Sequence, residues 1–277
     1  MNKKCYFNGK FVDFDEVKIS PYDLGFLRGY GVFDAMKTVN EKWFLFDEHW
    51  NKFVSSAQEL NLNIPVSKEE FRDILEKLKE AMNCENCAAR TILTGGVSED
   101  TFNVGENPTF LILLKDLEKM SPPKEIYEGV KVVTIEHKRS VFRAKNSNYI
   151  SAIQNQTKKR EAGAIEIVYV YNNKALEAST SNFFIIQKGK LITPLEDVFW
   201  GTTRNLVIEL AEKNGIEVEE REVSVDEMFN ADEMFLTATY KNIIPVIKVN
   251  DREIGNGKIG EVTKKLMGIL EDFMKNY

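Results

Sequence analysis

The chain has 277 residues, 43% of them hydrophobic and 29% charged, which is the composition of a globular protein long enough for one large or two moderate domains. Its formal net charge of -6 argues against nucleic acid or an anionic membrane as the main partner, since both bind basic surfaces. No apolar run approaches the roughly 20 residues that span a bilayer, and the N-terminus lacks the apolar core of a signal peptide, so a cytoplasmic protein is expected.

The three cysteines, Cys5, Cys84 and Cys87, are too few and too unevenly spaced for a framework of disulfides, which favours a reducing compartment. Cys84 and Cys87 have the C-x-x-C spacing of redox and zinc sites. However, the chain has only two histidines, His49 and His137, and no second cysteine pair. A closed four-ligand zinc site therefore lacks ligands, and no metal is expected.

The first part of the chain predicts a domain of mixed α and β structure over residues 1–118. Asn8-Gly9 joins two short extended runs, and such a pair forms the two-residue turn of a hairpin. A second hairpin is predicted around Asn40-Glu41. Helices are predicted where apolar residues recur every three or four positions, and the second begins with a capping box from Ser67 to Glu70. The predicted helices are 47–60 and 67–82, and the predicted strands are 90–94 and 109–114.

The polar stretch 119–124, which contains two prolines, is predicted to be a linker, and residues 125–277 a second, larger domain. In this part short apolar runs alternate with helical patterns, which again indicates an α+β unit. The predicted helices are 149–161, 203–214 and 258–276, and the predicted strands are 130–135, 165–171, 183–186, 190–193, 216–219, 233–236 and 243–249. The pattern thus favours two α+β domains with a cleft between them.

Two stretches carry the clearest chemical signal. Lys145 lies in a polar run between a predicted strand and a predicted helix, and Glu177 directly precedes a cluster of Ser, Thr and Asn residues. A lysine that can form an imine, together with a separate carboxylate that can hold a pyridinium proton, is the pair that pyridoxal phosphate chemistry requires.

Four motifs then give a specific resemblance: Lys145-x-x-Asn148-Tyr149, Glu177-x-x-x-x-Asn182-Phe183, Gly201-Thr202-Thr203-Arg204 before a helix, and Thr237-Ala238-Thr239. In this order the chain resembles, over almost its whole length, the class IV (fold-type IV) aminotransferases. That family includes D-amino acid and branched-chain aminotransferases and aminodeoxychorismate lyase. The resemblance implies a two-domain fold-type IV enzyme with pyridoxal 5′-phosphate in the cleft between its domains, working on amino acids and 2-oxo acids. It also implies a homodimer in which a loop reaches the partner's site.

The resemblance implies a role for several residues at the cofactor. Lys145 would be its covalent attachment and the base at the substrate Cα, and Glu177 would hold the proton of the ring nitrogen. Tyr149 would bond the ring hydroxyl, although a place in the core at a helix start is the alternative. The phosphate would be held by Thr202, Thr203, Thr239 and Lys52. Lys52 stands where the family usually has an arginine, so it would offer the phosphate a point charge in place of a bidentate guanidinium. The alternative is that Lys52 belongs to a solvated helix face.

The substrate pocket departs most from the usual pattern of the family. The usual D-amino acid members bind the substrate carboxylate with an Arg-x-His pair in the loop after the strand of Arg90, but this chain has Ser98-Glu99-Asp100-Thr101-Phe102 there. Arg28 and Arg90 together resemble a less common, two-arginine type of D-amino acid transaminase, in which Arg28 would reach across a dimer interface. The alternative for both arginines is a structural ion pair. Phe33 and Lys37 are expected to line the same pocket.

The sequence therefore predicts a pyridoxal-phosphate-dependent aminotransferase that moves an amino group from an amino acid, with D-glutamate or D-alanine favoured, to a 2-oxo acid such as 2-oxoglutarate. Branched-chain L-aminotransferases also carry an arginine near Arg90 and are the alternative. The lyase is less favoured, because its members have Arg-Gly where this chain has Thr94-Gly95-Gly96.

Overall fold

A computed structural model of the chain describes residues 4–120 and 122–277, which divide into two units. The first unit holds residues 4–120 with Ala144–Asn148 and Tyr277, and the second holds Pro122–Arg143 with Tyr149–Asn276. The segment predicted as a linker, 119–124, includes Ser121, which lies outside the described residues. The 3-10 helices η2 (Glu118–Met120) and η3 (Lys124–Glu128) flank that position.

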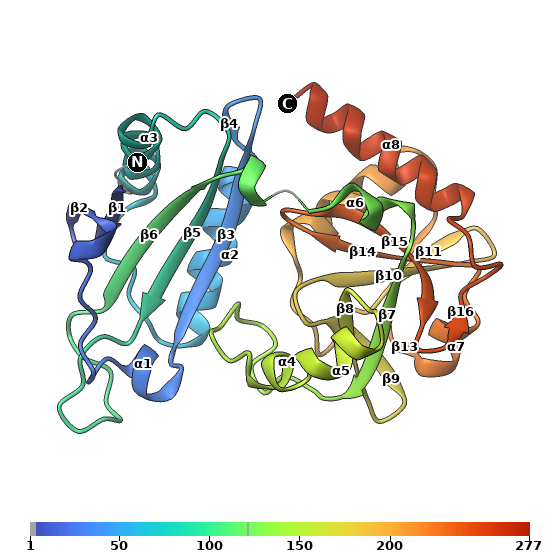
Figure 1. The fold of residues 1–277 in the computed structure, drawn as a ribbon, viewed down its shortest axis with the longest axis horizontal. Coiled ribbons are helices and arrows are strands. Elements are labelled where there is room, and N and C mark those ends of the chain that lie inside the picture. Colours follow the sequence, from blue (N-terminus) through green and yellow to red (C-terminus); the bar gives the residue numbers. More distant parts are fainter. Residues whose placement is uncertain (1–3, 121) are drawn as a thin grey trace. The chain divides into compact units, whose positions relative to one another are not determined.

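The first unit is built on a sheet with the strand order β2-β1-β6-β5-β3-β4 (Figure 1). Its strands are β1 (Lys4–Phe7), β2 (Lys10–Asp13), β3 (Gly31–Val39), β4 (Lys42–Trp43), β5 (Cys87–Thr94) and β6 (Thr109–Asp116). Asn8 and Gly9 have φ values of 45° and 88°, and Asn40 and Glu41 have φ values of 48° and 65°. Both predicted hairpins are confirmed, because these positive values are those of a two-residue turn that matches the strand twist.

Helices cover one face of this sheet. They are α2 (Phe46–Glu59) and α3 (Lys68–Met82), and a third short helix, α1 (Leu24–Arg28), precedes β3. Phe53 of α2 lies 6.4 Å from the ring of Phe71 on α3 and 6.3 Å from that of Phe110 on β6, so buried aromatic rings hold both helices against the sheet. The predicted capping box is present, since Ser67 Oγ accepts from the Glu70 N–H at 3.2 Å and Glu70 Oε2 from the Ser67 N–H at 2.7 Å.

The second unit contains a ten-stranded mixed sheet in the order β12-β11-β10-β14-β15-β7-β8-β9-β13, with β16 paired to β15. The strands are β7 (Val130–Glu136), β8 (Glu166–Tyr171), β9 (Lys174–Ala178), β10 (Asn182–Gln187), β11 (Lys190–Thr193), β12 (Val218–Glu220), β13 (Val223–Ser224), β14 (Glu233–Ala238), β15 (Asn242–Val249) and β16 (Arg252–Glu253). Its apolar core is formed largely by strand residues such as Val132, Val168, Phe183, Ile185 and Leu236.

The helices of the second unit are α4 (Ile150–Gln154), α5 (Gln156–Glu161), α6 (Thr202–Lys213), α7 (Val225–Phe229) and α8 (Glu261–Lys275). The single helix predicted over 149–161 is wrong, because the chain breaks at Asn155, which has φ -96° and ψ 9°. There the Asn155 side chain donates to the Ser151 carbonyl at 2.9 Å and the Gln156 side chain to the Ala152 carbonyl at 2.9 Å. The Ser151 carbonyl also accepts from the Asn155 N–H at 3.2 Å, as it would in a continuous helix, so these side-chain bonds accompany the break and do not replace that backbone bond.

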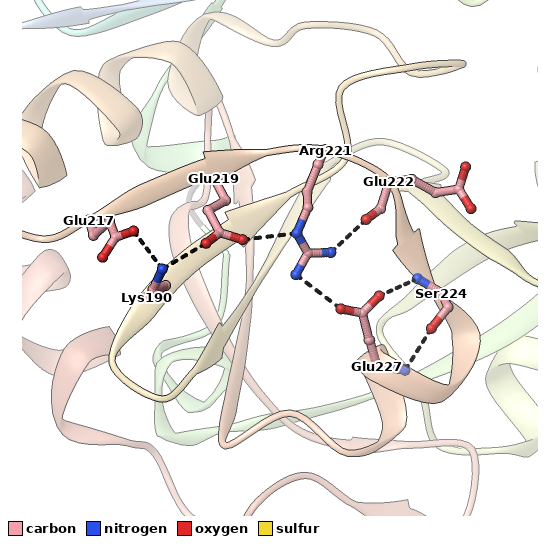
Figure 2. Close-up of polar contacts among 7 residues, drawn as sticks. All are labelled: Lys190, Glu217, Glu219, Arg221, Glu222, Ser224 and Glu227. Atoms are coloured by element: carbon pink, nitrogen blue, oxygen red, sulfur yellow. Dashed lines mark hydrogen bonds and ion pairs between the residues drawn. The ribbon is translucent and has the colours of Figure 1, made fainter.

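One edge of the second unit carries a network of ion pairs (Figure 2). Lys190 lies between Glu217 and Glu219 at 2.6 and 3.0 Å, and Arg221 bonds Glu219 at 2.9 Å and Glu227 at 3.0 Å. These side chains are 31–63% exposed, so solvent screens the network. Among the helices of residues 4–120 and 122–277, none combines the length and apolar character needed to cross a membrane.

Candidate active site

The backbone of Lys145 is held firmly within the first unit. The Phe33 N–H donates to the Lys145 carbonyl at 2.9 Å, the Lys145 N–H donates to Ser56 Oγ at 3.1 Å, and Asn146 forms a β-bridge with Val32. Ser56 is fully buried on α2. The segment is therefore fixed between β3 and α2 through its main chain, and the lysine Nζ lies 5.2 Å from the centre of the Phe33 ring.

Phe33, Lys37 and Arg90 share one face of the sheet, opposite to the face that the helices cover. In the register of β3 and β5, Arg90 stands opposite Ala35 and therefore between Phe33 and Lys37. The Arg90 guanidinium lies 5.3 Å from the Phe33 ring centre and is exposed. Lys37 is buried, and burial lowers the pKa of its amine to about 8. The first unit thus brings Lys145, Phe33, Lys37 and Arg90 together.

Arg28 lies elsewhere, at the end of α1, where it meets the loop between β5 and β6. Its Nη2 donates to Thr101 Oγ1 at 3.2 Å, and its guanidinium lies 5.0 Å from the Phe102 ring centre. Asp100 shapes this loop by accepting from the N–H groups of Asn103 and Phe102 at 2.8 and 3.0 Å, and these bonds lower the pKa of its carboxyl to about 2. The loop that lacks the Arg-x-His pair of the usual D-amino acid members is thus contacted by the guanidinium of Arg28 from α1.

Lys52 is half-buried on α2, one turn before Ser56 and on the same side of the helix. On the preceding turn, His49 Nδ1 lies 2.7 Å from Asp34 Oδ2, and both side chains are buried. Asp34 belongs to β3, so this contact ties the helix that carries Lys52 to the strand that carries Phe33 and Lys37. The sequence offered no sign of the His49–Asp34 pair, because the two residues are 15 positions apart.

In the second unit, Glu177 is buried on β9 and paired with Arg139. Arg139 Nε lies 3.2 Å from Glu177 Oε1, and Arg139 Nη2 donates to the Ser179 carbonyl at 3.1 Å. Burial alone would lower the pKa of Arg139, but the charge of Glu177 together with Tyr149 and Tyr169 raises the pKa above its ordinary value. The Tyr149 ring centre lies 5.4 Å from the same guanidinium, at the N-cap of α4. This arrangement places a cation directly beside a buried carboxylate.

A second buried carboxylate lies behind the turn that follows Glu177. Glu166 on β8 accepts hydrogen bonds from the hydroxyls of Ser179, Thr180 and Ser181, the last two at 2.6 and 3.2 Å. Lys241 Nζ lies 3.4 Å from the same carboxylate. Four side-chain donors on one buried carboxylate make the turn between β9 and β10 rigid, and that turn sets where β9 ends.

The N-terminus of α6 is the clearest place for an anion. Gly201 caps this helix of 12 residues without a side-chain cap, so the N–H groups at Thr202 and Thr203 are offered to a ligand. Thr202 is buried and Thr203 half-buried, and Thr239 is half-buried in the turn after β14. Among the described residues no partner hydrogen-bonds Thr237 Oγ1, although Thr237 is only 2% exposed.

These donors fit a phosphate, which has several acceptor oxygens and a negative charge that a helix N-terminus stabilises. Arg204 does not serve this purpose, because its fully buried guanidinium is bound to the Pro194 carbonyl and to Glu220, both at 2.8 Å. The buried Glu177–Arg139 pair fits a protonated pyridine nitrogen. Within residues 4–120 and 122–277, no group of three or more His, Cys, Asp or Glu side chains is placed to hold a metal ion.

Sequence reasoning assigned no role in this site to Arg139, Glu166 or Asn182. Glu166 did have a signal, since it is the one carboxylate within the apolar run Ala164-Ile165-Glu166-Ile167-Val168, and a charge in such a strand has to be paired. Asn182 did belong to the motif Glu177-x-x-x-x-Asn182-Phe183, but nothing in that motif indicated its contact with Phe199, 17 positions away. Nothing in the sequence indicated the pairing of Arg139 with Glu177, because the two residues lie far apart in the chain and are brought together only by the fold.

Comparison with known proteins gives one consistent result. Residues 31–249 match the family description "Amino-transferase class IV". The chain is 32% identical to a putative branched-chain-amino-acid aminotransferase of Methanocaldococcus jannaschii, over 97% of this chain and 96% of that protein. It is 28% identical to a D-alanine aminotransferase of Bacillus licheniformis, over 97% and 96%.

Solved structures show the same fold. The Escherichia coli branched-chain amino acid aminotransferase superposes with a TM-score of 0.91 at 22% identity, covering 99% of this chain and 95% of that one. The branched-chain aminotransferase of the thermophilic archaeon Thermoproteus uzoniensis, solved with norvaline, gives a TM-score of 0.89 at 23% identity, covering 99% and 95%.

Proposed function

Because the chain belongs to the class IV aminotransferases, which use pyridoxal 5′-phosphate, we propose that it transfers the amino group of an amino acid, with D-amino acids preferred, to a 2-oxo acid such as 2-oxoglutarate. The contact of Arg28 with Thr101 and Phe102 supports the D preference most directly. It puts a guanidinium at the loop from which the usual D-amino acid members bind the substrate carboxylate.

Lys145 would hold the cofactor through Nζ, and its amine would serve as the base that takes the proton from the substrate Cα. Bound pyridoxal phosphate supplies an electron sink for the bond that breaks there. Glu177 holds the proton on the ring nitrogen, and Arg139 keeps Glu177 charged through the 3.2 Å ion pair. Tyr149 lies against Arg139 and would bond the ring hydroxyl. The lysine and the carboxylate thus handle two different protons.

The phosphate is held by backbone N–H groups and hydroxyls at Thr202 and Thr203, by the hydroxyl of Thr239 and by the charge of Lys52. A helix N-terminus favours an anion by its dipole, and Lys52 adds a point charge where the family usually has a planar fork. The burial of Thr202 keeps water away from this contact. A phosphate held in one orientation would also fix the position of the ring, so that the reacting groups are already close together.

Arg28 and Arg90 bind the substrate α-carboxylate, with Arg28 contributed by the second copy of a homodimer. Phe33 and Lys37 line the space for the substrate side chain. Arg28 is exposed at the end of a short helix, so it can serve a neighbouring copy while Thr101 and Phe102 hold its side chain in place. Each guanidinium offers the paired donors that a carboxylate accepts.

A branched-chain L-amino acid aminotransferase is the second candidate. The relative from Methanocaldococcus jannaschii at 32% identity favours it, since that protein is named as a putative enzyme of this kind. The half-buried Phe33 and Ile92, on the same face as Arg90, offer apolar surface that suits an aliphatic side chain as well as it suits D-alanine.

Half-reactions with D-glutamate, D-alanine and L-leucine separate the two candidates. We expect the D-amino acids to react faster with the wild-type protein. Arg28→Ala and Arg90→Ala should each lose roughly tenfold to a hundredfold in kcat/KM, because a charge-assisted contact contributes about 1.5–3 kcal/mol. A primary amine without a carboxylate should react equally with all three proteins.

Arg72→Ala is the matched control, because Arg72 also stacks on a phenylalanine, 4.0 Å from the Phe46 ring centre, and its ion pair with Asp47 is exposed. It should leave every half-reaction unchanged. Unchanged D-amino acid rates together with lost L-leucine activity in the Arg28 and Arg90 variants would identify the enzyme as a branched-chain aminotransferase.

A further inference from the structure

We propose that Asn182 is a positioning residue that locks the N-terminus of the phosphate-binding helix α6 and the carboxylate Glu177 to a single backbone segment, Phe199-Trp200-Gly201. This inference rests on the proposed roles of Glu177 and α6, and it adds Asn182 as a residue that positions both of them. The consequence is that the phosphate and the ring nitrogen of the cofactor are held by one connected unit.

The Asn182 side chain grips this segment at two points. Its Oδ1 accepts from the Gly201 N–H at 3.1 Å, and its Nδ2 donates to the Phe199 carbonyl at 2.6 Å. The side chain is 7% exposed. An amide is suited to this task because it presents one acceptor and one donor in the same plane, whereas a carboxylate only accepts.

The gripped segment also contacts Glu177. The Phe199 N–H donates to Glu177 Oε2 at 3.2 Å, while the carbonyl of the same residue is bound by Asn182. Two residues later Gly201 caps α6 and Thr202 begins it. A displacement of Phe199 therefore moves the donor to Glu177 and the helix N-terminus together.

Gly201 shows how closely the segment lies against Asn182. A Cβ atom at this position would lie 2.4 Å from Asn182 Oδ1, which is closer than real Cβ contacts allow. The φ of Gly201 is -62°, so the conformation itself does not require glycine. Glycine is needed here for the close approach of the amide.

The anchor itself is rigid. Asn182 is the first residue of β10, where it pairs with Thr237 of β14, and the Ala178 N–H donates to the Ser181 carbonyl at 2.8 Å in the turn before it. Glu166 binds the hydroxyls of that turn. Because Asn182 is fixed in the sheet, its two hydrogen bonds determine where the segment Phe199-Trp200-Gly201 lies relative to the sheet.

The test compares binding of pyridoxal 5′-phosphate and of pyridoxal, which lacks the phosphate, to the full-length protein. Asn182→Ala should weaken binding of the phosphate form by about ten- to hundredfold, because two backbone contacts that place the phosphate donors are lost. Binding of pyridoxal should weaken by less than about threefold. A merely structural role would weaken both ligands alike.

Asn182→Asp provides a variant of the same shape. It keeps the acceptor for Gly201 and replaces the donor to Phe199 with a negative charge, so it should weaken binding of the phosphate form at least as much as Asn182→Ala does. Asn250→Ala is the matched control, because Asn250 likewise accepts from the Thr134 N–H and donates to Thr134 Oγ1, both at 2.9 Å. It should leave the ratio of the two affinities unchanged.

The coupling to Glu177 is measured by combining Asn182→Ala with Glu177→Gln. If both act through Phe199, their effects on cofactor binding should be non-additive. Strict additivity, or an Asn182→Ala protein with the wild-type preference for the phosphate form, would overturn the inference. If the wild-type protein itself shows no preference for the phosphate form, the phosphate site assigned above is wrong and the proposed function fails with it.

Discussion

Arg139 and Arg221 offer a direct comparison of burial with the number of ion pairs. Arg221 bonds two carboxylates and a carbonyl in the network of Figure 2, but its side chain is 38% exposed. Arg139 pairs with one carboxylate, Glu177, and both side chains are largely removed from solvent, at 11% and 4% exposure. If the number of ion pairs decided stability, Arg221 would contribute more than Arg139 to the free energy of unfolding. If burial decides it, Arg139 contributes more.

Replacement of Arg139 by methionine leaves the buried Glu177 without its cation. Removing one partner of a buried pair costs about 3–5 kcal/mol, because the remaining charge has no water to replace the lost contact. The bond from Arg139 to the Ser179 carbonyl is lost as well. The exposed pairs of Arg221 are screened by solvent, so Arg221→Met should cost much less.

Urea unfolding of Arg139→Met, Arg221→Met and Arg139→Met/Glu177→Gln measures these differences. We expect the Arg139 variant to be the least stable single variant. We also expect the double variant to recover much of the loss, because a neutral amide can stay buried at lower cost than a carboxylate. The reasoning is refuted if Arg221→Met is the more damaging change, or if the Arg139 and Glu177 effects simply add.

Two further predictions concern single charges in the site. Glu177→Gln removes the charge that holds the ring proton, so the cofactor should remain bound while proton abstraction from Cα slows greatly, and a half-reaction at the wild-type rate would contradict this role. Lys37 has a pKa lowered by burial from 10.5 to about 8. Below pH 8 the folded protein bears the full cost of this buried charge, and between pH 8 and 10.5 it releases the proton before the unfolded chain does. The stability of the wild-type protein relative to Lys37→Met should therefore rise with pH over that range, by up to about 3 kcal/mol, and a flat difference in unfolding free energy would exclude a buried charge.

Local features of the sequence predicted local structure well. The Asn8-Gly9 hairpin and the Ser67–Glu70 capping box are confirmed, because each depends on residues within three positions of one another. The helix predicted over 149–161 failed for a related reason. Its apolar spacing is helical, but the backbone leaves helical geometry at Asn155, with φ -96° and ψ 9°, and periodicity carries no information about such a local break.

Motifs over longer distances predicted the family, the fold class and the cofactor, and the family match over residues 31–249 confirms these. They proposed residues for the site but not the contacts that hold those residues in place. Lys145 belongs to the first unit because its backbone pairs with β3, which lies far earlier in the chain. The Arg139–Glu177 pair and the grip of Asn182 on Gly201 likewise depend on strand order, which local patterning does not specify. The preference for D-amino acids stays a prediction.

The most direct test of the account is the position at which the cofactor is attached. Borohydride reduction of the purified protein followed by peptide mapping should find the covalent adduct on Lys145, whose backbone is fixed between β3 and α2. Lys37 is the informative rival, because its lowered pKa gives it more of the neutral amine that forms such adducts. An adduct on Lys145 alone supports the assignment of the site. An adduct on Lys37, or on any other lysine, would contradict it.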